Sequence, residues 1–343
     1  MGSITLPEDV LQKVRGMTQR VGIIGGGLSG LTCAQTLRRA GFYVDVFEQD
    51  RIIGGRIATA RIGGQSFDHG AQYVTARGAS FGRLLDELTG TGYAARWTPT
   101  TNEAGDPSVQ LLPWMVGTPG MASMIRPLAE GLRIHTGQKA HTIARTDTKS
   151  DQSWNIWFED QTTAGPFRAI VIAVPAPQAR LLLGRMEEFV EPLSRVRMMP
   201  CWALMAGFED PILPNQDVFS DMSEVIRWIA RNSHKPRRSK AMETIVVHAS
   251  PGYSRESESV EPEIIAEEIW GEVSRALSLR STKPAILSAH LWKYGLVDQS
   301  LGESYLFSSR HMVGVTGDWC LGRLAEHAFD SGQSLARAMI NSL

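Results

Sequence analysis

Three glycines and one carboxylate occur at a spacing that suits the binding of a dinucleotide. Gly25, Gly27 and Gly30 follow the apolar run 21–24 in a GxGxxG pattern, and Glu48 closes the next apolar run. Glycines at these positions allow a tight turn, close approach of a pyrophosphate and close packing of a helix on a strand. The helix N-terminus then faces the phosphates, and the acid binds a ribose hydroxyl pair. The alternative is a glycine-rich loop in an ordinary βα unit.

A glycine doublet beyond the acid indicates which dinucleotide is bound. Gly54 and Gly55 continue the chain as a loop that exposes its backbone beside the pyrophosphate, and Arg56 counters the phosphate charge. This extended pattern is typical of FAD-binding proteins, and an NAD enzyme has no need of it. Near the C-terminus, a short apolar run ends in Gly317-Asp318, which resembles the second FAD motif, whose acid holds the ribitol chain. We therefore predict non-covalent FAD, with further ligands at Ser29, Gln49, Arg51, Gln72 and Tyr73.

The elements that must position these motifs predict an α/β fold with a discontinuous, Rossmann-like FAD-binding domain. Its predicted pieces are 20–78, 131–178 and 295–343, after an N-terminal extension at 1–19. The apolar run 169–174, closed by a proline, is typical of a buried strand that leads to a domain crossing.

The remaining segments, 79–130 and 179–294, predict a substrate domain that combines an antiparallel sheet with helices. Predicted strands lie at 201–208, 225–230, 243–250 and 285–294, and predicted helices at 120–132 and 263–277. The apolar stripe of the second helix indicates a core face.

Composition excludes several classes of function. The chain has 343 residues, a formal charge of −1 and a pI of about 6.7, which gives no electrostatic case for nucleic acid or an anionic membrane. Cys33, Cys201 and Cys320 form no CxxC and no metal-like spacing, so neither disulfides nor a metal site is predicted. No signal peptide and no run of eighteen apolar residues are found, so a cytoplasmic protein is predicted.

Beyond the FAD motifs, the chain resembles the renalase family, within the amine-oxidase-like flavoproteins, from about residue 20 to its C-terminus. The resemblance favours the bacterial branch of that family. The residues that carry it are Gly54-Gly55-Arg56, Asp68-x-Gly70-Ala71-Gln72-Tyr73, Ala173-Val174-Pro175-Ala176-Pro177-Gln178-Ala179, Trp228-x-Ala230-Arg231-Asn232-Ser233, Val247-His248-Ala249-Ser250-Pro251, His290-x-Trp292-x-Tyr294 and Gly317-Asp318-Trp319-Cys320.

The resemblance implies an oxidase that takes a hydride to flavin N5 from dihydronicotinamide dinucleotides reduced at ring position 2 or 6. Oxygen then receives the electrons as hydrogen peroxide, and NAD(P)+ is the product. The resemblance also implies that Glu326, His327 and Ala328 lie beneath the flavin pyrimidine. The family usually has glycine between the other two residues, so His327 is a departure that either turns away from the cofactor or alters the site.

Strand periodicity then predicts a surface that could hold the nicotinamide ring. Alternation in 285–294 places Ser288 with His290, Trp292 and Tyr294 on one face, and Leu287, Ala289 and Leu291 on the other. His248 shares a face with Val246 and Ser250 on another strand. The alternative is a half-buried sheet whose histidines are satisfied by neighbours.

The basic segment 232–240 offers a second substrate contact. Asn232, Lys235 and Arg238 could bind the phosphates of a dinucleotide substrate, whereas the simpler interpretation is a solvated turn.

Three functions are therefore open. The first is an oxidase of dihydronicotinamide isomers with O2 as electron acceptor, the second a flavin-dependent amine oxidase with an aromatic cage, and the third a non-catalytic flavin-binding sensor. No oligomeric state is indicated.

Overall fold

The computed structural model describes residues 20–101, 112–148, 151–184, 186–279 and 283–343. The chain divides into two compact units, one of Met1–Gly55, Pro127–Arg197 and Gln299–Leu343, the other of Arg56–Arg126 and Met198–Asp298. These boundaries differ from the predicted ones, because 56–78 and 295–298 fall in the second unit and 127–130 and 179–197 in the first. The predicted extension at 1–19 lies outside the described residues.

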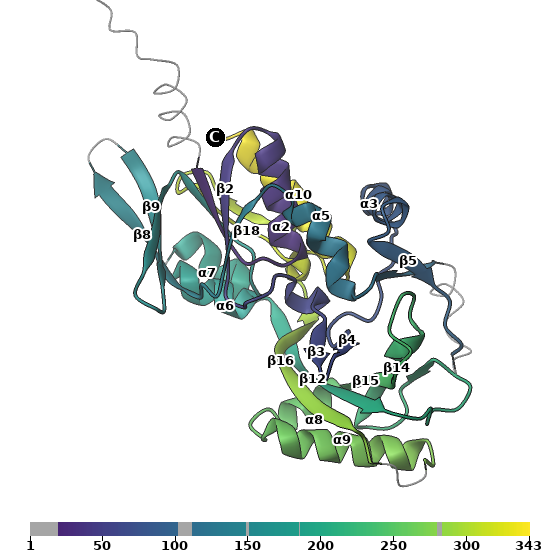
Figure 1. The fold of residues 1–343 in the computed structure, drawn as a ribbon. Helices are drawn as coiled ribbons and strands as arrows, with labels where there is room; N and C mark the ends of the chain where they lie inside the picture. Colours follow the sequence, from purple (N-terminus) through teal and green to yellow (C-terminus); the bar gives the residue numbers. More distant parts are fainter. Residues whose placement is uncertain (1–19, 102–111, 149–150, 185, 280–282) are drawn as a thin grey trace, which may run out of the picture. The chain divides into compact units, whose positions relative to one another are not determined.

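The first unit is built on a six-stranded sheet, and it confirms the predicted α/β class. The strand order is β17 (Leu306–Ser308), β18 (Val313–Val315), β11 (Ala169–Ile172), β1 (Arg20–Ile24), β2 (Tyr43–Glu48) and β7 (Arg133–Thr136). All neighbours are parallel except β17 and β18. The apolar runs at 21–24 and 169–172 are fully buried, which explains why they read as continuous hydrophobic segments. Helices α2 (Leu28–Arg39) and α10 (Ala325–Ile340) lie against each other (Figure 1).

A three-stranded antiparallel sheet completes this unit, together with α6 (Ala176–Leu183) and α7 (Glu187–Ser194). It has the order β10 (Thr163–Phe167), β9 (Asp151–Phe158) and β8 (Ala140–Thr148). Phe47 of β2 packs its ring 5.1 Å from that of Phe158 and 5.9 Å from that of Phe167. These contacts join the small sheet to the parallel one.

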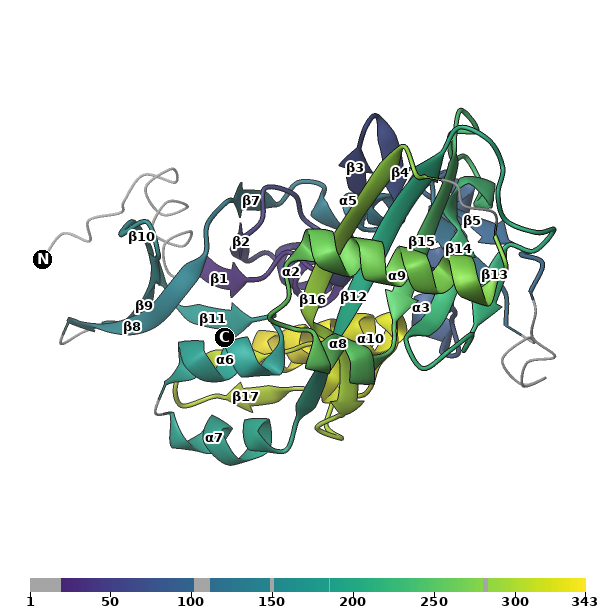
Figure 2. The same ribbon diagram turned by 90° about the horizontal axis from the view of Figure 1, so that it is seen from below.

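The second unit contains a five-stranded sheet and confirms the four predicted strands. Its order is β13 (Val218–Ser220), β14 (Ile226–Arg231), β15 (Glu243–Ala249), β12 (Arg197–Phe208) and β16 (Ile286–Gln299). Helix α9 (Pro262–Ala276) lies across one face of this sheet, beside α8 (Pro251–Glu256) (Figure 2). Its stripe of Ile265, Ile269 and Val273 is buried in the core, as the periodicity predicts.

Shorter elements complete the second unit. They are η1 (Gly55–Ile57), the hairpin β3 (Ala60–Ile62) and β4 (Gln65–Phe67), α3 (Ala79–Gly90), and the pair β5 (Ala94–Trp97) and β6 (Trp114–Gly117). Phe67 of β4 is buried against Met205 and Val246 of the five-stranded sheet, which accounts for the assignment of 56–78 to this unit.

The predicted continuous helix at 120–132 is wrong. The chain instead forms η2 (Met121–Ile125) and then the single turn α5 (Arg126–Ala129). Pro127 cannot donate an N–H to a preceding turn, and Gly131 has a left-handed φ of +70° that ends the helix.

No helix in the described ranges is long and apolar enough to cross a membrane. Cys33, Cys201 and Cys320 are buried and unpaired.

Candidate functional site

The glycine loop between β1 and α2 has the geometry that its sequence predicts. Gly25 has a φ of +110°, a conformation that residues with side chains rarely adopt. A Cβ on Gly30 would overlap the carbonyl oxygen of Gly25, so helix and loop touch through their backbones. Glycine at both positions is therefore a steric requirement of the fold itself.

Gly27 differs, because a Cβ placed there would have no atom within 4 Å. It precedes the first turn of α2, and no side chain caps the N–H groups of that turn. These groups and the open face beside them can receive a pyrophosphate. Gly54 lies alongside, since it pairs with Gly27 and its N–H donates to the Gly26 carbonyl at 3.1 Å. Both predicted glycine loops are thus together, and the residues present fit FAD.

Glu48 turns its carboxylate to this loop. Its Oε2 accepts the N–H of Gly26 at 2.8 Å, and its Oε1 accepts that of Asp50 at 3.0 Å. Burial raises the pKa of Glu48 despite these two donors. Two further predicted ligands, Gln49 and Arg51, are exposed beyond it.

The two predicted FAD motifs meet through a chain of hydroxyl groups. Ser29 Oγ lies 2.7 Å from Thr316 Oγ1, which lies 2.7 Å from Ser331 Oγ on α10. Ser331 Oγ also accepts the N–H of Gly317 at 3.2 Å. Asp318 is buried, and its Oδ1 accepts the N–H of Trp319 at 2.8 Å. The Gly-Asp motif is therefore tied to the start of α2, from the other end of the sequence.

His327 folds back onto the start of α10. Its Nδ1 accepts the N–H of Leu324 at 3.3 Å, and the ring occupies the space that a side chain at residue 322 would need. Glu326 beside it is buried, and Ala328 is half-buried. The histidine therefore caps the helix that it begins.

We expect His327→Gly to lower the free energy of unfolding by about 1 kcal/mol, because the Leu324 N–H loses its acceptor. His327→Ala separates this loss from the flexibility that glycine adds. Urea unfolding measures the stability, and the flavin spectrum and substrate preference should stay those of the parent. A changed preference at unchanged stability would instead assign the histidine to the site.

In the second unit, strand register places predicted residue His248 in a row with two residues that were not predicted. Trp228 of β14 pairs with His248 of β15, and His248 pairs with Ala203 of β12, so the three residues share one face. On β16, Leu287, Ala289 and Leu291 pack against the apolar core, as the alternation predicts.

The carbonyl oxygen of His69 joins two of the residues predicted to contact the nicotinamide ring. His248 Nε2 and Trp292 Nε1 each donate to it at 3.0 Å. The His69 ring lies 5.0 Å from that of His290 and 4.9 Å from that of Trp292. Tyr294 is half-buried and, within the described ranges, is not part of this ring cluster. His248 and Trp292 therefore hold the segment at residue 69 against the sheet.

The imidazoles of His69 and His248 are uncharged at neutral pH. Burial lowers the pKa of His248 to about 4. Burial, with a smaller effect of nearby His290, lowers the pKa of His69 to about 4. His69 Nδ1 is buried and has no hydrogen-bond partner among the described residues.

Asn232, Lys235 and Arg238, which are predicted to bind substrate phosphates, are buried in internal contacts, so the alternative of a solvated turn is wrong for these three residues. Lys235 Nζ lies 3.2 Å from Asp68 Oδ2, and an Arg238 nitrogen lies 2.6 Å from the same oxygen, all buried. Asn232 donates to the Ser66 carbonyl at 2.7 Å. Their partners lie more than 160 residues away in sequence, so local composition could not reveal an internal ion pair.

Burial and mutual attraction together set the pKa values of Asp68 and Lys235 in this buried ion pair. Burial alone would raise the pKa of Asp68, but the charges of Lys235 and Arg238 lower it to about 2. Burial lowers the pKa of Lys235 to about 8, in spite of the attraction of Asp68. Predicted ligand Gln72 joins the cluster, because its Oε1 accepts from Lys235 Nζ at 3.2 Å. Arg56, another predicted cofactor ligand, contacts the segment that follows Asp68, because its carbonyl oxygen accepts the N–H of Ala71 at 2.8 Å.

An aromatic cluster lies beside this ion pair. The rings of Tyr73 and Trp114 stack at 3.9 Å with an interplanar angle of 2°. Trp228 lies 5.8 Å from Trp114, and its Nε1 is buried without a hydrogen-bond partner among the described residues. Lys235 Nζ lies 5.3 Å above the ring of Trp97. The cluster offers flat apolar faces.

Sequence reasoning missed several of these residues. Asp68, His69 and Trp228 stand inside motifs that carry the family resemblance, and that position was an available signal. Trp97 and Trp114 stand in no motif, and only β-pairing of their strands brings them together.

Two family models match the chain. A model described as NAD(P)-binding Rossmann-like domain matches residues 23–88, and one described as flavin containing amine oxidoreductase matches residues 97–340.

Individual proteins are similar to this chain either in sequence over a short stretch or in fold over most of the chain. Protoporphyrinogen oxidase 2 of Arabidopsis thaliana is 35% identical over 88 residues, which are 26% of this chain and 17% of that protein. The chain superposes on cyclohexylamine oxidase of Brevibacterium oxydans with a TM-score of 0.69 at 14% identity, covering 94% of this chain and 99% of that one. For putrescine oxidase bound to putrescine the TM-score is 0.67 at 13% identity, with coverages of 94% and 99%. These structures share the fold.

Proposed function

Because the chain belongs to the family of flavin-containing amine oxidoreductases and is an FAD-dependent oxidoreductase, we propose that it oxidises dihydronicotinamide dinucleotides reduced at ring position 2 or 6. The overall reaction consumes the dihydronicotinamide, O2 and a proton and yields NAD(P)+ and hydrogen peroxide. Bound FAD would supply the hydride acceptor. No carboxylate or imidazole base is required, since the dihydropyridine loses its hydride without prior proton removal.

The proposal rests on a group of imidazole and indole side chains in the second unit. Trp228 and His248 share a face of the sheet, and His69, His290 and Trp292 form a cluster of touching rings. Loss of a hydride turns a neutral dihydropyridine into a cation, which aromatic faces stabilise by about 0.5–2 kcal/mol. His69 and His248, both neutral, add no repulsion.

Other residues of the chain would hold the cofactor. The N–H groups at the start of α2, beside Gly27, would bind the pyrophosphate, and Glu48 would accept hydrogen bonds from the ribose hydroxyls. Asp318, on the motif joined to Ser29 through Thr316, would bind the ribitol chain.

The proposal is tested by mixing the purified flavoprotein, without oxygen, with NADH that contains its 2- and 6-dihydro isomers. Bleaching of the flavin absorbance, with recovery and peroxide on admitting air, is the expected result. Pure 4-dihydro NADH is the control and should bleach the flavin far more slowly. Equal bleaching by all isomers, or none by any, contradicts the proposal.

A primary or secondary amine is the second candidate substrate. The family match supports it, and so does the cluster of Tyr73, Trp114 and Trp228, whose flat faces suit an apolar amine. Bleaching by members of an amine panel, with none by the dihydronicotinamide isomers, would assign this function.

We expect Glu48→Gln to weaken FAD binding by about tenfold, because an amide is a poorer acceptor for ribose hydroxyls than a carboxylate. The binding should also depend on pH in the parent. Hydroxyl donors favour ionised Glu48, whose pKa is raised in the protein, so FAD affinity should fall as pH falls through that pKa. Fluorescence titration of apoprotein with FAD measures the affinity and its dependence on pH. A pH dependence that persists in Glu48→Gln would contradict the role of Glu48 as the ribose ligand.

A further inference from the structure

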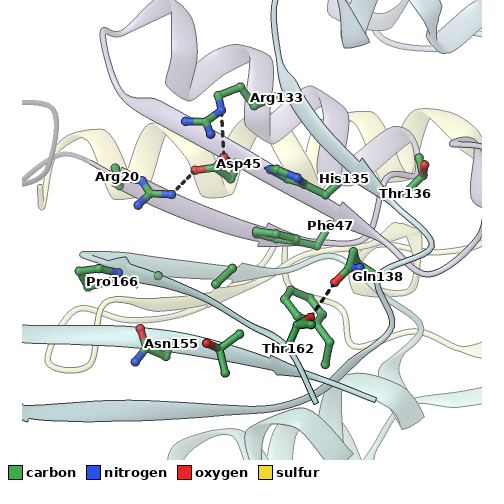
Figure 3. Close-up of a pocket in the computed structure, with 14 residues that line it drawn as sticks. Arg20, Asp45, Phe47, Arg133, His135, Thr136, Gln138, Asn155, Thr162 and Pro166 are labelled. Atoms are coloured by element: carbon green, nitrogen blue, oxygen red, sulfur yellow. Dashed lines mark hydrogen bonds and ion pairs between the residues drawn. The ribbon is translucent and has the colours of Figure 1, made fainter. Parts of the chain in front are cut away.

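A pocket of about 670 Å³ lies in the first unit, between β1, β2 and β7 on one side and β9 and β10 on the other (Figure 3). Its volume is in the range of sites for small organic ligands. Both walls contribute polar side chains. Arg20, Asp45, Arg133 and His135 come from the parallel sheet, and Asn155 and Thr162 from the antiparallel sheet and its turn.

This pocket is separate from the predicted dinucleotide site. Asp45 and Phe47 line it, and because they are two residues apart on β2 they share one face of the sheet. Glu48 is three residues beyond Asp45, so it points to the opposite face, about 10 Å further along the strand. Arg20 and Arg133 are the first residues of β1 and β7, whereas the glycine loop follows the carboxyl end of β1.

Positive charge exceeds negative charge in the part of the pocket near the first residues of β1 and β7. Asp45 Oδ2 lies 2.8 Å from an Arg20 nitrogen, and its Oδ1 lies 3.4 Å from Arg133 Nε and 3.2 Å from His135 Nε2. Burial alone would raise the pKa of Asp45, but hydrogen bonds from Arg20 and His135, helped by the charges of Arg20 and Arg133, lower it. One carboxylate therefore faces two guanidinium groups, which leaves an excess positive charge.

Both arginines keep donors available. The Arg133 side chain is 68% exposed and contacts Asp45 through Nε. The Arg20 side chain is 25% exposed and contacts Asp45 through one terminal nitrogen. Two guanidinium groups with donors to spare fit the oxygens of a carboxylate or phosphate.

The rest of the pocket offers a different surface. The rings of Phe47 and His135 stack at 4.8 Å with an interplanar angle of 13°, and Phe158 lies 5.1 Å from Phe47. The Asn155 amide and the Thr162 hydroxyl face them from the other wall (Figure 3). A ligand here meets cations at one end and, at the other, the partly exposed ring of His135, which buried Phe47 supports from behind.

We propose that this pocket binds a small organic anion, with its carboxylate or phosphate on Arg20 and Arg133 and its planar portion against the ring of His135, which is 40% exposed. The site is independent of the oxidase reaction and holds a ligand other than FAD.

The test titrates the FAD-loaded protein with benzoate, phenyl phosphate and phenol by isothermal calorimetry. Saturable binding of benzoate or phenyl phosphate is expected, and the tighter of the two identifies the anionic group. Phenol should bind at least about tenfold more weakly, since it lacks the charge that the arginines recognise.

Variants then locate the binding. Arg133→Ala and Asn155→Ala, one from each wall, should each weaken it, the former by at least about tenfold. The matched control is Arg275→Ala on α9, because Arg275 is also exposed and also paired with a carboxylate. The flavin spectrum and melting temperature verify folding, and Arg133→Gln replaces Arg133→Ala if the latter is unstable.

Three outcomes would overturn the proposal. They are no saturable binding of either anion, undiminished binding in both wall variants, and equal weakening in Arg275→Ala, which would indicate a general charge effect.

Discussion

Asp68→Asn should lower the free energy of unfolding by about 3–5 kcal/mol, the range for breaking a buried ion pair by removal of one partner. The carboxylate is fully buried and accepts from Lys235 and Arg238, and its Oδ1 accepts from Thr59 Oγ1 and the Met121 N–H, each at 2.9 Å. Asparagine retains the shape but leaves both cations without a counter-charge. Urea denaturation followed by circular dichroism measures the loss.

Two comparisons make this result specific. Asp86→Asn, at an exposed aspartate on α3 of the same unit, should leave stability unchanged. The double variant Asp68→Asn with Lys235→Met should recover part of the loss, because one of the two uncompensated charges is removed with it. A loss below about 1 kcal/mol in Asp68→Asn would show that the cluster is not a buried ion pair in solution.

The same carboxylate predicts how stability responds to acid. Its folded-state pKa of about 2 is lower than the value of about 3.9 expected in the unfolded chain. The stabilisation is therefore fully present above about pH 4 and is lost as pH falls towards 2. Asp68→Asn should flatten the stability profile in this window.

Gly27→Ala should weaken FAD binding roughly 5- to 150-fold and leave the fold intact. The fold has room for the methyl group, since a Cβ at Gly27 meets no atom within 4 Å, and the φ of −82° suits alanine. A pyrophosphate that approaches the backbone would meet that methyl group, and such overpacking costs about 1–3 kcal/mol. FAD titration of apoprotein measures the affinity, and thermal unfolding of the apoprotein measures the fold.

Gly271→Ala is the matched control. It makes the same change inside α9, where a Cβ also meets no atom within 4 Å. It should leave FAD affinity unchanged and stabilise the helix by about 0.5–1 kcal/mol. Parent-like FAD affinity in Gly27→Ala would mean that the pyrophosphate does not lie over this glycine.

Local sequence determined the parts of this protein that depend on backbone sterics and strand alternation. The glycine loop was predictable because Gly25 and Gly30 admit no side chain in a βα turn of this tightness. The buried strands β1 and β11 were predictable from continuous apolar runs, and the faces of β16 from a period of two. The second FAD motif was predictable as a short strand that ends in Gly317-Asp318.

Only the tertiary structure decided what the polar residues do. Lys235 and Arg238 look like a surface charge run, but packing places them on Asp68, and a buried charge must find a partner wherever the chain supplies one. His248 and Trp292 were predicted as residues of a surface for the nicotinamide ring, and the structure adds their shared acceptor, the His69 carbonyl, which comes from a distant loop. Such pairings depend on register and loop closure over more than 160 residues, which no local pattern encodes.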